Sequence, residues 1–253
     1  MSSRGLLLIA LALSSGCTDT EQDRVSVPLY VAGVDVSEPF MAVGDVAVTL
    51  ERAELAFGPL YLCAGATAGD LCDTARLEWL DAVVVDTTSP IPVRAGELAG
   101  VTGPVRSWMY DLGISSQLTR SEPFVLDAAR QLGDVSFRVE GWAHVRGARV
   151  PFSAAVPVQQ TATTELGVPV VRKSTSESFA REVTADDLGL VVRFDPGSWI
   201  RSIDFRSYVE DEACLNGAAC EAWTLTPDSE AFRSLHNALV SGARPAFEWN
   251  YVP

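Results

Sequence analysis

Strict alternation of apolar and polar residues is the clearest pattern in the chain. It runs from Val135 to Val145, is interrupted at Arg146-Gly147, and resumes from Val150 to Val156. A period of two places successive side chains on opposite faces of a strand. The two segments therefore predict a β-hairpin with one face on a hydrophobic core and the other toward solvent.

Shorter apolar runs bounded by Gly, Pro, Ser and Thr predict further strands. Between residues 46 and 57 the apolar positions change from even to odd numbers, which predicts a β-bulge near Glu51 and Arg52. The remaining strand segments are 25–32, 60–63, 77–85, 105–112, 123–126, 168–172, 188–194 and 247–252.

Helical signals are few and lie late in the chain. Asp195-Pro196 favours a short helical turn, and residues 226–242 combine a capping Thr226, a following proline and a final Gly242. Many short strands with few helices predict a mainly β fold, an antiparallel β-sandwich with one short C-terminal helix. We expect one sandwich domain over residues 25–253, although the Thr-rich stretch 159–164 leaves a division into two subdomains open.

The first sixteen residues follow a different pattern. Arg4 precedes the apolar run Leu6–Leu13, and the small residues Ser14–Gly16 lead to Cys17. A basic start, a short apolar run and small residues before a cut site are typical of a secretory signal peptide. As a helix the apolar run would rise only ~12 Å, too little to cross a hydrocarbon core of ~30 Å.

These residues resemble the leader of a bacterial lipoprotein, in which a lipobox ends in a cysteine that receives diacylglycerol. Ser14 stands where that family usually has leucine. The resemblance implies a signal peptide over residues 1–16, acylation of Cys17 with palmitate-like chains, and a polar tether over 17–24. It also implies a lipid-anchored protein of the cell envelope, at the outer membrane, facing the periplasm or the surface. The alternative is an ordinary signal peptide, after which Cys17 stays an unmodified thiol.

The cysteine count fits an acylated Cys17. Of five cysteines, four then remain, an even number suited to two disulfides in an oxidising compartment. Four cysteines allow three connectivities, and the short spacings favour Cys63 with Cys72 and Cys214 with Cys220. Neither spacing is the C-x-x-C of a zinc knuckle, so we expect no metal there.

Composition narrows the classes of partner. With 47% apolar and 21% charged residues, the chain can bury a core. Its 19 Lys and Arg against 33 Asp and Glu give a net charge of −14, which disfavours binding to nucleic acid. The same acidity disfavours electrostatic adhesion to anionic lipids. We therefore expect membrane attachment through the N-terminal lipid, and an envelope protein or a glycan as the partner.

The polar face of the predicted hairpin is the candidate binding surface. Arg138, Glu140, Trp142 and His144 occupy alternate positions and therefore share one face. A tryptophan beside a carboxylate and an imidazole could stack a sugar ring or a peptide and hydrogen-bond to it. A solvated sheet face with one amphipathic aromatic residue is the alternative. By contrast, the apolar neighbours of Trp79, Trp108, Trp199 and Trp249 predict core packing.

No catalytic or cofactor motif stands out. The chain has no G-x-S-x-G elbow, no Gly-rich phosphate loop and no dinucleotide fingerprint. We therefore expect a non-enzymatic protein without a cofactor. Two alternatives rest on neighbouring acids, Asp186-Asp187 and Glu210-Asp211-Glu212. Such pairs could serve an envelope glycan hydrolase through paired carboxylates, or bind calcium through oxygen ligands.

Overall fold

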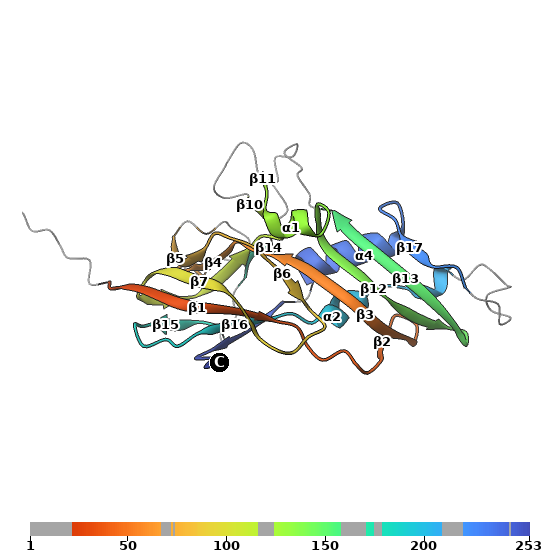
Figure 1. Cartoon of the computed structure of the whole chain (residues 1–253), viewed down its shortest axis with the longest axis horizontal. Helices are drawn as coiled ribbons and strands as arrows, with labels where there is room; N and C mark the ends of the chain where they lie inside the picture. The colour runs from red at the N-terminus through yellow and green to blue at the C-terminus, as the bar shows by residue number, and fades with distance from the viewer. Residues whose placement is uncertain are drawn as a thin grey trace, which may run out of the picture.

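Two large β-sheets form the body of the protein, which is elongated in the computed structural model (Figure 1). The structure describes residues 22–66, 72, 74–115, 124–157, 171–174, 179–208, 220–242 and 244–253. The leader with Cys17, the cysteine at 214, the acidic run 210–212 and the stretch 159–164 lie outside the described residues.

The larger sheet contains eight strands. Their order is β14 (Val171–Ser174), β9 (Ser107–Tyr110), β4 (Leu60–Cys63), β5 (Ala75–Trp79), β7 (Val93–Val101), β1 (Arg24–Ala32), β16 (Leu190–Arg193) and β18 (Ala246–Trp249). The sheet curls strongly, because Trp108 of β9 and Phe247 of β18 lie near its two ends and yet have ring centroids 5.2 Å apart. Its concave side is therefore filled with aromatic side chains.

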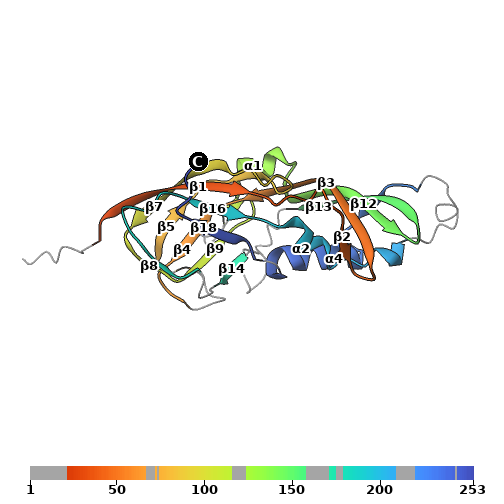
Figure 2. The same cartoon turned by 90° about the horizontal axis from the view of Figure 1, so that it is seen from below.

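The second sheet contains six strands. Their order is β17 (Trp223–Leu225), β13 (Ala148–Pro157), β12 (Val135–Val145), β3 (Val46–Phe57) and β2 (Phe40–Ala42), with β6 (Val83–Asp86) also pairing with β3. Helices α2 (Pro196–Ile200) and α4 (Glu230–Asn237) lie against one face of this sheet (Figure 2). On the opposite face, α1 (Asp127–Gln131) covers only the end near Ala56 and Val84. The rest of that face carries polar side chains.

Short elements complete the described chain. Two small sheets pair β8 (Gly103–Val105) with β15 (Arg181–Val183) and β10 (Ile114–Ser115) with β11 (Phe124–Val125). A 3₁₀ turn, η1, spans Phe205–Tyr208, and a π-helical turn, η2, follows α4 over Ala238–Gly242. No helix among these residues is long and apolar enough to cross a membrane.

One continuous hydrophobic cluster joins the two sheets. Strand β3 ends in the six-stranded sheet at Phe57, and after Gly58-Pro59 the chain enters β4 of the other sheet. Phe57 is fully buried and lies at this crossing, where its ring contacts those of Tyr110 and Phe194 at centroid distances of 5.4 and 5.0 Å. The core is therefore densest in aromatic residues where the chain passes between the sheets.

The prediction of a mainly β, sandwich-like fold is confirmed. The bulge in β3 is confirmed as well, because Glu140 pairs with Arg52 and Gly141 with Leu50, which leaves Glu51 without a directly opposed residue. The sheets are mixed, however, and not purely antiparallel. β1 pairs with β16 and β13 with β17 in parallel, since long connections bring these strands together from distant parts of the chain.

Strand β7 is the longest of the elements that the sequence pattern missed, which also include β2, α1, β15 and β17. Its Ala and Gly residues give it a weak strand signal, but it lies between β1 and β5 and pairs with both. Gly96 lies so close to Trp79 that an added Cβ would come within 2.6 Å of the indole Nε1. Glycine is required there because the tryptophan occupies the space of a side chain.

Helix α4 begins later than predicted. Thr226 does not cap it. Instead, the Ser229 hydroxyl accepts a hydrogen bond of 3.1 Å from the Phe232 backbone N–H. The Ser229 backbone N–H donates to the Thr226 carbonyl in a preceding turn. The first turn of the predicted helix is therefore a separate turn, and the helix runs over Glu230–Asn237.

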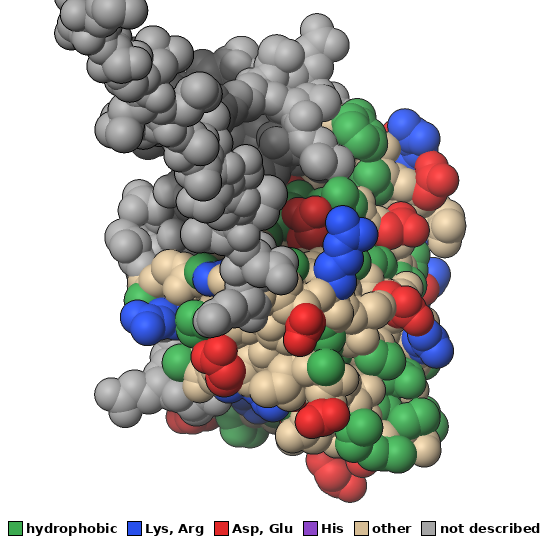
Figure 3. Space-filling view, turned by 90° about the vertical axis from the view of Figure 1, so that its left-hand side faces the viewer, with side chains coloured by type: hydrophobic (Ala, Val, Ile, Leu, Met, Phe, Trp, Pro, Cys, Tyr) green, Lys and Arg blue, Asp and Glu red, His purple; other side chains and the backbone are tan. Residues whose placement is uncertain are grey.

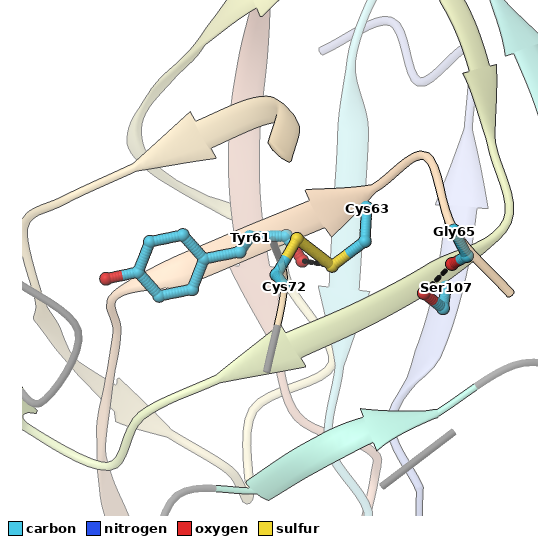
Figure 4. Close-up of a disulfide and its surroundings, with 5 residues drawn as sticks. All are labelled: Tyr61, Cys63, Gly65, Cys72 and Ser107. Atoms are coloured by element: carbon cyan, nitrogen blue, oxygen red, sulfur yellow. Dashed lines mark hydrogen bonds between the residues drawn. A yellow bond between two sulfur atoms is a disulfide. The ribbon is translucent and has the colours of Figure 1, made fainter. Parts of the chain in front are cut away.

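The local disulfide between Cys63 and Cys72 is confirmed (Figure 4). It closes a loop on the outer side of β4, where Tyr61, Met109 and the two half-cystines form a small buried cluster. The Ser107 hydroxyl of β9 also donates to the Gly65 carbonyl in this loop. Cys220 takes part in a disulfide too, and its predicted partner, the cysteine at 214, lies outside the described residues.

Candidate functional site

The face of the six-stranded sheet opposite α2 and α4 carries the predicted binding residues. Along β12 the alternation is as expected, since Val139 and Ala143 are buried while Glu140 and His144 are exposed. Neighbouring strands add outward residues to the same face. The outward side chains, together termed the Trp142 face, are Ala47, Thr49, Glu51, Arg52 and Glu54 of β3; Arg138, Glu140, Trp142 and His144 of β12; and Arg149, Pro151, Ser153 and Ala155 of β13.

Opposite charges face each other across β3 and β12. Arg138 is directly opposite Glu54, and Glu140 is directly opposite Arg52. The Arg52 guanidinium lies 2.8 Å from a Glu54 carboxylate oxygen and 4.0 Å from one of Glu140. The hydrogen bond and charge of Glu54 raise the pKa of Arg52 above its ordinary value. With three arginines and three glutamates, the Trp142 face is neutral although the whole chain carries −14.

Trp142 lies in the middle of this face and is covered by an arginine from the next strand. The guanidinium carbon of Arg149 lies 3.7 Å from the centre of the indole ring. The same guanidinium reaches across β12 to within 3.8 Å of the carboxylate of Glu51, the bulge residue of β3. Arg149 therefore forms a strap over Trp142 that is tied at its far end to Glu51.

The strap is weakly held, because both its ends are exposed to solvent. The side chains of Arg149 and Glu51 are 57% and 56% exposed. An exposed ion pair contributes ~0–1 kcal/mol and an exposed cation–π contact ~0.5–1 kcal/mol. Uncovering the indole would thus cost about 0.5–2 kcal/mol. The Trp142 Nε1 is buried and has no acceptor among the residues that the structure describes, which is also true of the Nε1 atoms of Trp199 and Trp249.

The four predicted residues differ in their contacts. Arg138 is half-buried and donates from Nη2 to the Leu132 carbonyl at 2.6 Å, which fixes it against the segment after α1. Glu140 belongs to the charge pairs, and His144 is exposed opposite Arg149. Glu51, Arg52 and Arg149 were not predicted. Their outward positions follow from the same alternation, but only strand pairing brings them to Trp142.

The predicted acidic pair at Asp186-Asp187 has separate environments for its two members. Asp186 is exposed, whereas the Asp187 side chain is 1% exposed and forms an ion pair with Arg181. Its second oxygen accepts a hydrogen bond of 2.8 Å from the Thr184 backbone N–H. The Asp187 carboxylate is thus already bound within the protein, where it holds Arg181 and the Thr184 backbone in place. Within the described part of the chain, no group of three or more His, Cys, Asp or Glu residues could hold a metal ion.

The predicted core tryptophans are placed as expected. Trp79, Trp108 and Trp199 are buried, and Trp249 is half-buried under the Arg181 guanidinium at 4.6 Å. Trp108 stacks on Tyr110 with centroids 5.5 Å apart inside the eight-stranded sheet. Trp223 of β17 is half-buried, pairs with the inward-facing Phe152 and contacts Phe205 at a centroid distance of 5.6 Å. The other five tryptophans thus pack against the core, and Trp142 is the one on the outward face of the six-stranded sheet.

A small pocket lies between α4 and the ends of β12 and β13. Its walls are mainly apolar, with His236 and Ser136 as polar members. Burial lowers the pKa of His236 below its ordinary value. The Ser136 hydroxyl already donates to the Leu112 carbonyl at 2.7 Å. Because ligand pockets usually place several polar groups toward the ligand, the Trp142 face is the better candidate.

We find no protein-family model and no curated protein sequence that matches the chain. Among solved structures, the chain is similar to MbnP from Methylosinus trichosporium, with 12% sequence identity and a TM-score of 0.43. The similarity covers 90% of this chain and 98% of that protein. At this level of similarity, the function of this chain has to be argued from its own residues.

Proposed function

We propose that the chain is a lipid-anchored binding protein of the bacterial envelope, in which the Trp142 face binds a glycan. The observation that carries the proposal is a half-buried tryptophan on the outward face of the six-stranded sheet, with charged side chains close by and its ring covered by a single exposed arginine. Aromatic rings of this kind stack on the apolar faces of sugar rings, and the flanking carboxylates and guanidinium groups can hydrogen-bond to hydroxyl groups.

The proposed location is supported by the leader and by the cysteines. The lipobox-like sequence ends at Cys17, and a disulfide at Cys63 and Cys72 suits an oxidising compartment. Where β1 begins, acidic and basic side chains are interspersed on the surface (Figure 3). Because neighbouring carboxylates weaken attraction to anionic headgroups, acyl chains are the better means of attachment.

Intact mass of the membrane-extracted protein tests the anchor. We expect loss of residues 1–16 and a gain in mass equal to diacylglycerol, with or without a further acyl chain, on Cys17. A Cys17→Ser variant should lack the added mass and leave the membrane fraction, because no other attachment is proposed. An unmodified Cys17 thiol in the wild-type protein would contradict the anchor. Recovery of the protein from the cytosol with its leader intact would contradict export.

Retention on polysaccharide affinity gels tests the binding face. We expect Trp142→Ala to weaken retention of the mature protein by about 10-fold or more, since tryptophans at binding surfaces often dominate the binding energy. Tyr251→Ala is the matched control, because Tyr251 is also a half-buried aromatic residue but lies beside Tyr30 on the other sheet. Equal retention of both variants and the wild type would contradict the proposal.

A further inference from the structure

The Arg149 strap indicates what kind of ligand could replace it. A cation now covers the indole ring at 3.7 Å, and its far end is paired with the Glu51 carboxylate. A ligand that stacks on Trp142 must displace the guanidinium from the ring. The displaced arginine then gains most from a ligand that brings a carboxylate of its own, because a bidentate arginine–carboxylate pair is stronger than a single exposed contact.

Charge is distributed unevenly around Trp142. Toward the hairpin turn lie His144 and Arg149, directly opposite each other, and the exposed Arg146 of the turn itself. Toward the bulge lie the carboxylates of Glu51 and Glu140. A ring over the indole would therefore meet cationic groups at one end and hydrogen-bond acceptors at the other. An acid fits the first end, and hydroxyl groups fit the second.

We propose that the Trp142 face recognises a single acidic sugar, a uronic acid residue within an otherwise neutral glycan. This inference rests on the binding function proposed above. The sugar ring stacks on Trp142, its carboxylate takes the place of Glu51 as the partner of Arg149, and its hydroxyl groups donate to Glu140. A second carboxylate would meet those glutamates and a chain of net charge −14, so a single acid is favoured over a polyanion.

Two matched monosaccharides test the inference, the methyl glycosides of glucuronic acid and of glucose, which differ only in a carboxylate against a hydroxymethyl group. Binding is followed through the indole N–H resonance of Trp142 in the full mature protein, assigned with Trp142→Phe. We expect about 10-fold tighter binding of the glucuronide. Arg149→Gln should remove this preference while both sugars still bind. Glu51→Gln should strengthen binding of the glucuronide, because it frees the strap.

The control is Arg94→Gln, which breaks a similarly exposed ion pair with Glu97 on the other sheet and should leave the preference unchanged. Equal affinity of the wild-type protein for both sugars, with polysaccharide retention weakened in Trp142→Ala, would overturn the acidic-sugar inference and leave the binding face intact. A preference that survives Arg149→Gln would overturn it as well. Polysaccharide retention that is unaffected in Trp142→Ala would overturn the proposed function itself.

Discussion

Replacing Phe57 with alanine is expected to lower the free energy of unfolding by about 3–5 kcal/mol. The side chain is fully buried, and its ring lies within 6 Å of three other aromatic rings, those of Trp79, Tyr110 and Phe194. Truncation removes these contacts and leaves a cavity at the point where β3 passes from one sheet to the other. Rigid rings on strands of the larger sheet cannot easily move to fill that space.

Urea unfolding of the mature protein with its disulfides intact measures this change. Phe124→Ala is the control, because the Phe124 side chain is 44% exposed and its loss should cost less than about 1 kcal/mol. We expect the unfolding midpoint to fall strongly for Phe57→Ala and little for Phe124→Ala. Similar midpoints for the two variants would show that Phe57 does not connect the two sheets energetically.

Replacing Asp187 with asparagine is expected to lower the free energy of unfolding by about 2–3 kcal/mol. The carboxylate is almost completely buried, pairs with Arg181 and accepts the Thr184 backbone N–H at 2.8 Å. The substitution leaves the partly buried Arg181 cation without its counter-charge. Because that guanidinium also lies 4.6 Å from the centre of the Trp249 ring, the packing of β18 should loosen.

Asp186→Asn provides a matched control, because the neighbouring carboxylate is exposed. Thermal unfolding of the two variants should show a clear drop in midpoint for Asp187→Asn and a change within about 0.5 kcal/mol for Asp186→Asn. Equal midpoints would mean that the Arg181 pair adds little to stability. Asp187 would then be open to the chemical role that its sequence position suggested.

Much of the candidate site could be predicted from the sequence. The period of two along β12 places Arg138, Glu140, Trp142 and His144 on one face whatever the partner strands are, because the alternation belongs to the strand itself. The strap could not be predicted. Glu51 and Arg149 are almost one hundred positions apart, and their approach depends on β3 and β13 flanking β12 in one particular register.

In the fold, too, local features could be predicted from the sequence and long-range features could not. Short-range patterns determined the hairpin, the bulge at Glu51 and the local disulfide between Cys63 and Cys72, because each depends on residues close in sequence. Strand β7 was not predicted because its glycines weaken the strand pattern. They are required only by tertiary contacts, which bring them close to Trp79 and Arg76 of β5.

The sequence by itself thus determined most of the longer strands and which of their faces are polar, and it predicts where a leader would end. Only the tertiary structure decided which strands are neighbours, that two pairs are parallel, and that Trp142 is covered by Arg149. The physical reason is the separation in sequence over which each effect acts. Periodicity and turn chemistry act within a few residues, whereas strand order and cross-strand contacts depend on burying one shared core, to which distant segments contribute together.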